Sequence, residues 1–320
     1  CVFCHSRAGG DDNVKHGDIS TDMTATTKQY DVHMGTDGGN FTCVKCHQVK
    51  KDSAGNTLSH GIGGMAFHSI DEGAMQVCSD CHGAVTSIHA GTSVESLVQS
   101  HSRLACQVCH IPTIARKVST MVDWRWAQAG LDAAPGTCAP ADPTVLPARP
   151  TYSKLKGCFT WKNNVRPTLR YFDGKWNRVM LNVNDQYASL PVDLASPTAT
   201  YQTPGAMIYP FKKMTGNQPA DSANKTVLVP NLFGNATTDP DAYWVSFDWG
   251  RALASGTFYT GQPYSGTYEF VDTVMLLKVD HEVAPAEQAY GKDNGCADCH
   301  FSDQIDWTAL GWTKDPATGG

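Results

Sequence analysis

The pattern C-x-x-C-H occurs five times in this chain of 320 residues, and no other feature constrains its fold as strongly. The copies are "CVFCH" at 1–5, "CVKCH" at 43–47, "CSDCH" at 78–82, "CQVCH" at 106–110 and "CADCH" at 296–300. With 12 Cys and 12 His in the chain, a random order of residues would produce roughly 0.02 such matches. The repeats therefore need a chemical explanation.

This spacing is the attachment signature of c-type haem. The two thiols form thioethers with the haem vinyl groups, and the imidazole binds iron from one side. Zinc is the alternative, but zinc ribbons combine two C-x-x-C pairs around one metal and do not need a histidine directly after each pair. The sequence therefore predicts five covalent haem c groups. The predicted attachment residues are Cys1, Cys4, Cys43, Cys46, Cys78, Cys81, Cys106, Cys109, Cys296 and Cys299, and the motif-side iron ligands are His5, His47, His82, His110 and His300.

Histidines outside the motifs are numerous enough to close the second face of every iron. Seven remain, and five haems need five more ligands. The candidates for these distal positions are His16, His33, His60, His89, His101 and His281, whereas His68 is doubtful. We expect His281 to serve a haem other than the one on Cys296 and Cys299. Bis-histidine coordination would restrict each haem to electron exchange, because neither face is open to a substrate.

Only two cysteines, Cys138 and Cys158, lie outside the motifs. Haem attachment takes place after export to an oxidising compartment, where an even remainder of cysteines indicates a disulfide. The alternative is two unpaired buried thiols. We expect a periplasmic or extracellular location, with the signal peptide, absent from this sequence, removed after export.

The balance of charge and hydrophobicity excludes some partners. The formal net charge is −6, and five haems would add propionate carboxylates, so a nucleic-acid partner, which needs a basic surface, is not expected. No stretch approaches the run of about 20 apolar residues that a membrane span requires. Cations near the motifs either pair with propionates or carry ordinary solvated charge. They include Lys15, Arg103, Arg116 and Lys117.

The motifs divide the chain unevenly. Residues 1–110 carry four motifs, 111–295 form an insertion without any, and 296–320 hold the fifth motif and a tail. Turn signals such as "FDGKW" separate β-branched runs in the insertion, which predicts loops and β-hairpins there. The expected fold class is a multihaem cytochrome c organised by its haems. Its secondary structure should be limited to short helices, irregular loops and a few small β-hairpins, and the three parts should form one compact unit.

Several segments in and around the motifs resemble one known family. They are "CHSRAGGDDNVKHGD", "DVHMGTDGGNFTCVKCHQ", "CSDCHGAVTSIHA", "HSRLACQVCHIPTIAR", "PFKKMTGNQP", "PYSGTYEFVDT", "HEVAPAEQAY" and "IDWTALGWTKDP". Together they span nearly the whole chain and resemble the octahaem tetrathionate reductase family of c-type cytochromes. The six candidate distal histidines match that family's histidine positions, whereas His68 does not. One departure is "RKVSTM" after "HIPTIA", where the family usually has Pro-Thr-Lys-Met.

The resemblance implies a longer family protein. Its members carry eight haems, and this chain is similar to the part with the last five. Three further haems would then lie upstream of Cys1, among them a lysine-ligated haem at which substrate binds. The five haems retained here would be bis-histidine relays.

Three functions are compatible with these features. We favour a multihaem electron carrier, which can also be a subunit of an extracellular cytochrome filament. The second function is the electron-transfer part of an octahaem reductase of sulfur or nitrogen oxyanions such as tetrathionate, nitrite or hydroxylamine, whose catalytic haem would lie outside this chain. The third is a structural or haem-storage protein. The expected partners are other redox proteins or copies of the chain in a homo-oligomer or filament, because haems near both chain ends suit a relay into a neighbour.

Overall fold

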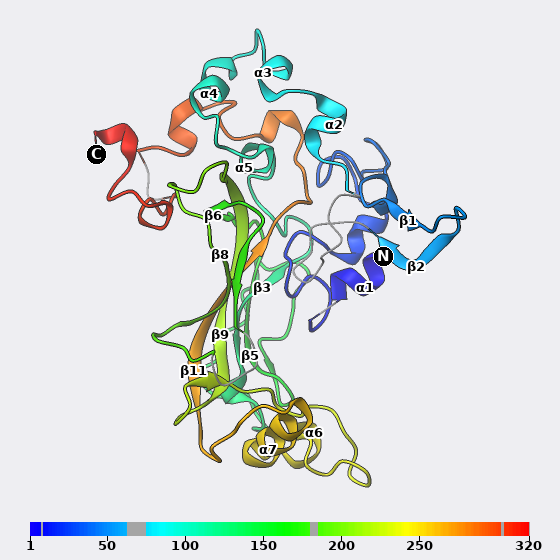
Figure 1. The fold of residues 1–320 in the computed structure, drawn as a ribbon, viewed down its shortest axis with the longest axis vertical. Helices are drawn as coiled ribbons and strands as arrows, with labels where there is room; N and C mark the ends of the chain where they lie inside the picture. Colours follow the sequence, from blue (N-terminus) through cyan, green and yellow to red (C-terminus); the bar gives the residue numbers. More distant parts are fainter. Residues whose placement is uncertain (8, 63–74, 180–184, 302–303, 320) are drawn as a thin grey trace.

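Two long antiparallel strands form the axis of the structure. The computed structural model describes residues 1–7, 9–62, 75–179, 185–301 and 304–319. Strands β9 (Met207–Asp221) and β11 (Tyr268–Lys278) pair along their length, from Tyr268 opposite Asp221 to Lys278 opposite Phe211. Figure 1 shows this ribbon running from the motif-bearing turns at one end to a pair of helices at the other.

The ribbon is the centre of a nine-stranded sheet with the order β4-β5-β3-β9-β11-β8-β7, to which β6 and β10 add by pairing with β9. The other strands are β3 (Thr120–Arg125), β4 (Tyr152–Ser153), β5 (Gly157–Lys162), β6 (Thr168–Phe172), β7 (Trp176–Arg178), β8 (Val192–Pro197) and β10 (Thr226–Val227). Strand β3 runs parallel to β9, and β8 runs parallel to β11. The sheet is larger than the small hairpins expected in the insertion, because strands distant in sequence pair through these parallel crossovers.

Short helical turns carry the motifs, as the sequence predicts. They are α1 (Val2–Arg7), η2 (Cys43–Lys45), α2 (Cys78–His82), α5 (Cys106–His110) and η5 (Gly295–Asp298). The remaining short elements are η1 (Thr21–Thr24), β1 (Val49–Lys51), β2 (Thr57–Ile62), α3 (Val85–Ile88), α4 (Glu95–Ser100), η4 (Ala286–Gln288), η6 (Thr308–Leu310) and η7 (Pro316–Thr318). Turn η3 (Trp126–Gln128) follows β3 at the far end of the sheet, where the N–H of Ala127 donates to Asn217 of β9 at 3.0 Å. The tail thus contains two 3-10 turns, η6 and η7.

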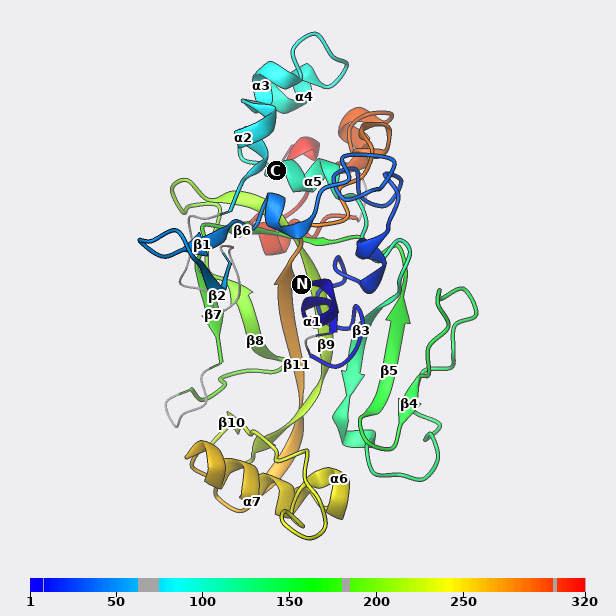
Figure 2. The same ribbon diagram turned by 90° about the vertical axis from the view of Figure 1, so that its right-hand side faces the viewer.

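Helices α6 (Tyr243–Ser246) and α7 (Trp249–Thr260) close the far end of the sheet (Figure 2). The Asp248 side chain caps α7 by accepting a hydrogen bond from the main-chain N–H of Arg251, and Gly261 ends the helix in a left-handed conformation. Gly256 lies directly against the carbonyl of Val229, where a Cβ atom would stand 2.2 Å from the oxygen. The helix can therefore approach the preceding strand segment only because this position lacks a side chain.

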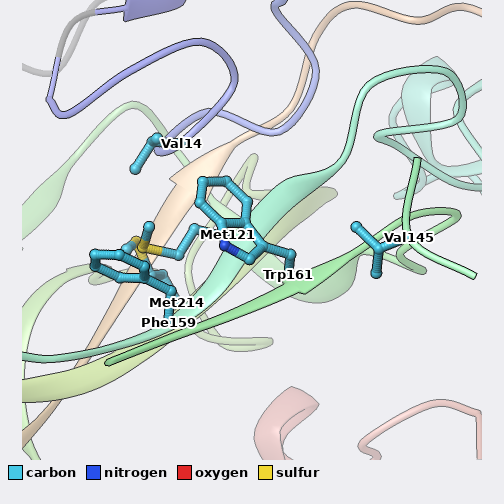
Figure 3. Packing of buried hydrophobic residues seen from close by; sticks show 6 residues of the cluster. All are labelled: Val14, Met121, Val145, Phe159, Trp161 and Met214. Atoms are coloured by element: carbon cyan, nitrogen blue, oxygen red, sulfur yellow. The ribbon is translucent and has the colours of Figure 1, made fainter. Parts of the chain in front are cut away.

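A hydrophobic cluster joins the N-terminal segment to the sheet (Figure 3). It consists of Val14, Met121, Val145, Phe159, Trp161 and Met214. Val14 comes from the loop after the first motif, and Met121, Phe159 and Met214 come from β3, β5 and β9. Burying an apolar side chain of this size contributes about 1.5–3 kcal/mol, so the cluster holds the first motif's segment against the centre of the sheet.

A fully buried lysine reinforces this attachment. Lys212 on β9 donates hydrogen bonds from its ammonium group to the carbonyls of Val14 (2.6 Å) and Lys15 (2.7 Å) and to the hydroxyl of Thr120 (2.5 Å). Burial lowers the pKa of Lys212 well below its usual value. Asn13 adds a hydrogen bond from its amide to the carbonyl of Val118 (2.7 Å). These contacts fix the backbone immediately before His16.

Cys138 and Cys158 form a disulfide with a Cα–Cα distance of 5.3 Å, the pairing expected from the sequence. It ties the loop before β4 to strand β5, where Cys158 is buried. Within the described parts of the chain, no helix is long and apolar enough to cross a membrane.

We predict that Lys212→Met lowers the free energy of unfolding of the haem-loaded protein by about 2 kcal/mol, because two buried carbonyls lose their donor. Guanidinium unfolding followed by the Soret band measures this change. The neighbouring Lys213 is exposed, so Lys213→Met is the matched control and should leave the midpoint unchanged. Equal stability of the two variants would contradict the role given to Lys212.

We also predict that the double variant Cys138→Ala, Cys158→Ala loses about 3 kcal/mol of stability, because the bond closes a loop with a sequence separation of 20 in the unfolded chain. Peptide mass mapping of the native protein provides the direct check. Neither cysteine should react with an alkylating reagent before reduction, and alkylation of both without reduction would rule the disulfide out.

Candidate haem sites

Each C-x-x-C-H motif folds into a single helical turn. The main-chain N–H of the motif histidine donates to the carbonyl of the first cysteine at 2.9 Å for His5, 2.9 Å for His47 and 2.8 Å for His300. Residues three and four positions apart lie on one face of such a turn. The turn therefore presents both thiols and the imidazole to the same side, as thioether attachment and iron ligation require.

Four motif histidines each face one histidine from outside the motifs. The ring centres are 6.1 Å apart for His47 and His281, 6.0 Å for His82 and His33, 6.2 Å for His110 and His89, and 5.9 Å for His300 and His101. Each of these pairs combines one predicted motif-side ligand with one predicted distal ligand. His281 faces His47 and not His300, as expected for a ligand of another motif's haem. We number the sites one to five in the order of their motifs.

The spacing within the pairs fits two axial ligands of one iron. A metal–imidazole nitrogen bond is about 2 Å long, and the ring centre lies roughly 1.2 Å beyond the nitrogen, so two imidazoles on opposite sides of one iron have centres about 6.4 Å apart. The four observed distances of 5.9 to 6.2 Å lie just below this value. The residues present therefore fit the haem irons that the motifs predict.

Hydrogen bonds at Nδ1 orient several of these rings. Nδ1 lies 2.7 Å from the carbonyl of Val85 in His89, 2.9 Å from that of Leu97 in His101, 3.1 Å from Asp18 Oδ2 in His281 and 2.6 Å from Asp315 Oδ1 in His300. Acceptors at this atom keep Nδ1 protonated and leave the lone pair of Nε2 for a metal. This arrangement is typical of metal-binding histidines.

Local sequence explains the two carbonyl contacts. His89 and His101 directly follow the short helices α3 and α4, at their C-cap positions. The last carbonyls of a helix have no partner within the helix. Each ring donates to the carbonyl four residues earlier, so the helix end both orients the ligand and is itself satisfied.

Asp18 supports His281 from a buried position. Its side chain is 2% exposed, and it also accepts hydrogen bonds from the main-chain N–H groups of Asp280 (2.9 Å) and His281 (3.0 Å). Burial favours the neutral carboxyl, but His281 and these donors hold the pKa of Asp18 at about 2. For His281, burial alone would lower the pKa. The hydrogen bond and the charge of Asp18 outweigh burial, so the pKa of His281 is raised to about 9.

The fifth site has a second carboxylate and an aromatic wall. Asp315 accepts from the His300 ring and from the main-chain N–H groups of Phe301 (2.6 Å) and Ala317 (2.9 Å). The Trp307 indole stacks on the His300 ring with centres 5.0 Å apart and an interplanar angle of 13°. The tail from η6 to η7 therefore covers the ligand of this site.

Contacts between neighbouring motifs connect the sites in sequence order. The main-chain N–H of Gln76, two residues before the third motif, donates to the carbonyl of Cys46 in the second at 2.9 Å. The side chains of Cys78 and Cys106 are in hydrogen-bond contact and join the third motif to the fourth. Val108 of the fourth motif and Cys299 of the fifth line one small cavity. Sites two to five thus follow one another as neighbours.

The segment after the first motif reaches the second site. His16 stands two residues before Asp18, whose carboxylate contacts His281 of the second site. His60 belongs to β2, but its side chain and the whole of His68 lie outside the described residues. For the site of His5, His16 and His60 are the two distal candidates not used elsewhere.

Three of the cations near the motifs, Arg103, Arg116 and Lys117, have protein partners. Arg103 donates to the carbonyls of Ala206 (2.9 Å), Tyr201 and Thr203 (3.2 Å). Arg116 is buried against Glu282 at 3.4 Å and also donates to main-chain carbonyls. The two guanidinium groups thus bind loops together and are not simply solvated, whereas propionate pairing stays a prediction. Lys117 pairs with Asp22 at 2.6 Å.

Sequence reasoning did not identify the residues that support the ligands. Asp18 follows His16 by two residues in "KHGD", and Asp315 and Trp307 belong to the tail segment "IDWTALGWTKDP". The short distance from a candidate histidine was the one available signal for Asp18. No local pattern marks Asp315, because its partner lies 15 residues earlier.

Comparisons with known proteins agree with this geometry. A family model described as bacterial cytochrome c matches residues 121–303. The fold is similar to the crystal structure of octahaem cytochrome c from Shewanella oneidensis, with a TM-score of 0.74 and 32% sequence identity. The likeness covers 95% of this chain and 65% of that one, so the chain spans about two thirds of that protein's length. No curated protein matches the chain.

We predict that His89→Ala retains all five haems and converts one of them from low spin to high spin, because the thioethers remain while one axial ligand is lost. Intact mass counts the haems, and electron paramagnetic resonance detects the high-spin iron. His68→Ala is the matched control and should leave every haem low spin. A fully low-spin His89→Ala protein would exclude His89 as a ligand.

Proposed function

We propose that this chain, which belongs to the bacterial cytochrome c family, carries electrons through a row of five covalently attached, bis-histidine haems. The multihaem cytochrome c fold expected from the sequence is confirmed by the match to octahaem cytochrome c, and the family implies covalently bound haem c. Bound haem iron supplies one-electron chemistry by alternating between its ferric and ferrous states.

The observation that carries this proposal is the set of four facing imidazole pairs. Each pair would close both axial positions of one iron, so a substrate would find no open coordination position at these sites. The Nδ1 contacts of His89, His101, His281 and His300 hold the rings in place. Rigid ligands that remain the same in both oxidation states favour electron exchange over bond-making chemistry.

The contiguity of the sites supports a relay. Each motif from the second to the fifth contacts the next one or the residues beside it. Figure 1 shows α1 beside the middle of the sheet, and α2 and α5 above it, toward the end of the sheet where the C-terminal segment lies. A row of this kind allows an electron to enter at one end and leave at the other.

The likeness to octahaem cytochrome c favours a second candidate. Because the chain spans 65% of that protein, it would also serve as the electron-transfer part of a larger octahaem reductase of sulfur or nitrogen oxyanions. In that case the catalytic haem would lie outside this chain, and the five sites would deliver electrons to it.

The exposed residues near the two ends of the row of haem sites suggest where partners would bind. The chain termini lie on opposite sides of the sheet in Figure 1. Phe3 on α1 is 68% exposed, and Phe301, next to His300, is 66% exposed. These positions suit contact with other redox proteins or with further copies of the chain in a homo-oligomer or filament. We place the protein in the periplasm or outside the cell, since haem c is attached after export.

We predict that the native protein shows five haems by intact mass and only low-spin signals by electron paramagnetic resonance. Nitrite or hydroxylamine should leave these signals unchanged, because a bis-histidine iron has no free position. A high-spin component that shifts with either ligand would instead support the reductase. A larger native mass with eight haems would identify the chain as part of the longer protein.

A further inference from the structure

Two of the four paired sites have a carboxylate on a ligand ring. Asp18 contacts Nδ1 of His281 at the second site, and Asp315 contacts Nδ1 of His300 at the fifth. At the third and fourth sites, the one hydrogen bond to a ligand ring among the described residues runs from Nδ1 of His89 to the main-chain carbonyl of Val85. The row of sites is therefore chemically uneven.

Asp315 is built into the fifth site. Its side chain is 10% exposed and accepts hydrogen bonds from two main-chain N–H groups as well as from the His300 ring. Pro316 follows at the start of η7, and the Thr318 hydroxyl donates to the Asp315 carbonyl at 2.7 Å. The carboxylate is thus fixed before any haem is considered.

Trp307 limits the freedom of the same ligand. Its indole lies nearly parallel to the His300 ring, on the wall formed by the tail. The ring is therefore held at its face by Trp307 and at its Nδ1 edge by Asp315. An asparagine in place of Asp315 could keep the contact to Nδ1 while removing the charge.

Asp18 occupies the equivalent position at the second site. It is more deeply buried than Asp315, at 2% exposure, and two main-chain N–H groups hold it. The neighbouring Asp280 is paired with Lys278 at 2.5 Å, so Asp18 is the carboxylate that contacts the His281 ring directly.

A carboxylate on Nδ1 changes the iron as well as the ring. It withdraws the ring proton toward itself, which makes Nε2 a stronger electron donor, and it adds a negative charge close to the metal. Both effects stabilise the ferric state more than the ferrous state. Hydrogen bonding to the ligand is one of the means by which a protein sets a haem potential.

We propose that Asp18 and Asp315 are positioning residues that lower the reduction potentials of the haems at the second and fifth sites. This inference rests on the proposed bis-histidine function of the two sites. It adds that the reduction potentials along the row are unequal. Each of the two haems beside a carboxylate has a lower potential than it would have beside a neutral acceptor.

The test uses the haem-loaded protein and the near-isosteric variant Asp315→Asn. An asparagine oxygen in the place of Oδ1 can still accept from Nδ1 of His300, but its amide nitrogen then faces the main-chain N–H of Phe301, so that hydrogen bond is lost together with the charge. Asp18→Asn is the cleaner variant, because a single oxygen of Asp18 accepts its three hydrogen bonds and an asparagine oxygen can keep them. Redox titration followed by visible and electron paramagnetic resonance spectra should show one of the five couples shifted to higher potential and the other four unchanged. Asp18→Asn should shift a different single couple in the same direction, and Asp315→Glu, which restores a carboxylate, should reverse at least part of the first shift.

The matched control is Asp293→Asn, which removes a charge three residues before Cys296. Asp293 is 73% exposed and pairs with Lys292, so no couple should move comparably. If the asparagine variants keep five low-spin haems and no couple shifts, or if Asp293→Asn shifts one equally, the inference is overturned. If Asp315→Asn loses a haem, the Asp18→Asn couple decides the outcome alone. High-spin iron in the unmodified protein would instead contradict the proposed function.

Discussion

The meeting of two imidazoles about 6 Å apart is the contact on which the rest of the molecule depends. A motif turn can place its own histidine, but the facing histidine must come from elsewhere. His281 reaches His47 from the end of β11. The long ribbon of β9 and β11 therefore positions a ligand, because β11 returns the chain from the far end of the sheet to the second site.

Polar contacts secure this geometry before the cofactor contributes. Lys212 and Asn13 fix the segment before His16, and Arg116 binds Glu282 beside His281. Buried charges of this kind are stable only when their hydrogen bonds are satisfied. Specific polar contacts thus fix the position of the backbone where a loop that carries a ligand histidine packs against the sheet.

The environment of each ligand ring distinguishes sites that share one motif. A carbonyl at the end of a short helix holds His89 and His101, whereas a carboxylate holds His281 and His300. The first kind of acceptor follows from helix geometry and adds no net charge. The second brings a formal charge to the ligand, so sites with the same C-x-x-C-H turn can differ in their electronic properties.

The sequence by itself determined the attachment chemistry, because two thiols and a histidine within five residues share one helical turn whatever surrounds them. It also marked His33, His89, His101 and His281 as ligand candidates, through the surplus of histidines and the family resemblance. Only the tertiary structure decided which motif each of them faces, because a pair such as His47 and His281 joins segments distant in sequence. The same holds for Asp18 and Asp315, since a carboxylate becomes a ligand's partner through packing, and no local pattern encodes that packing.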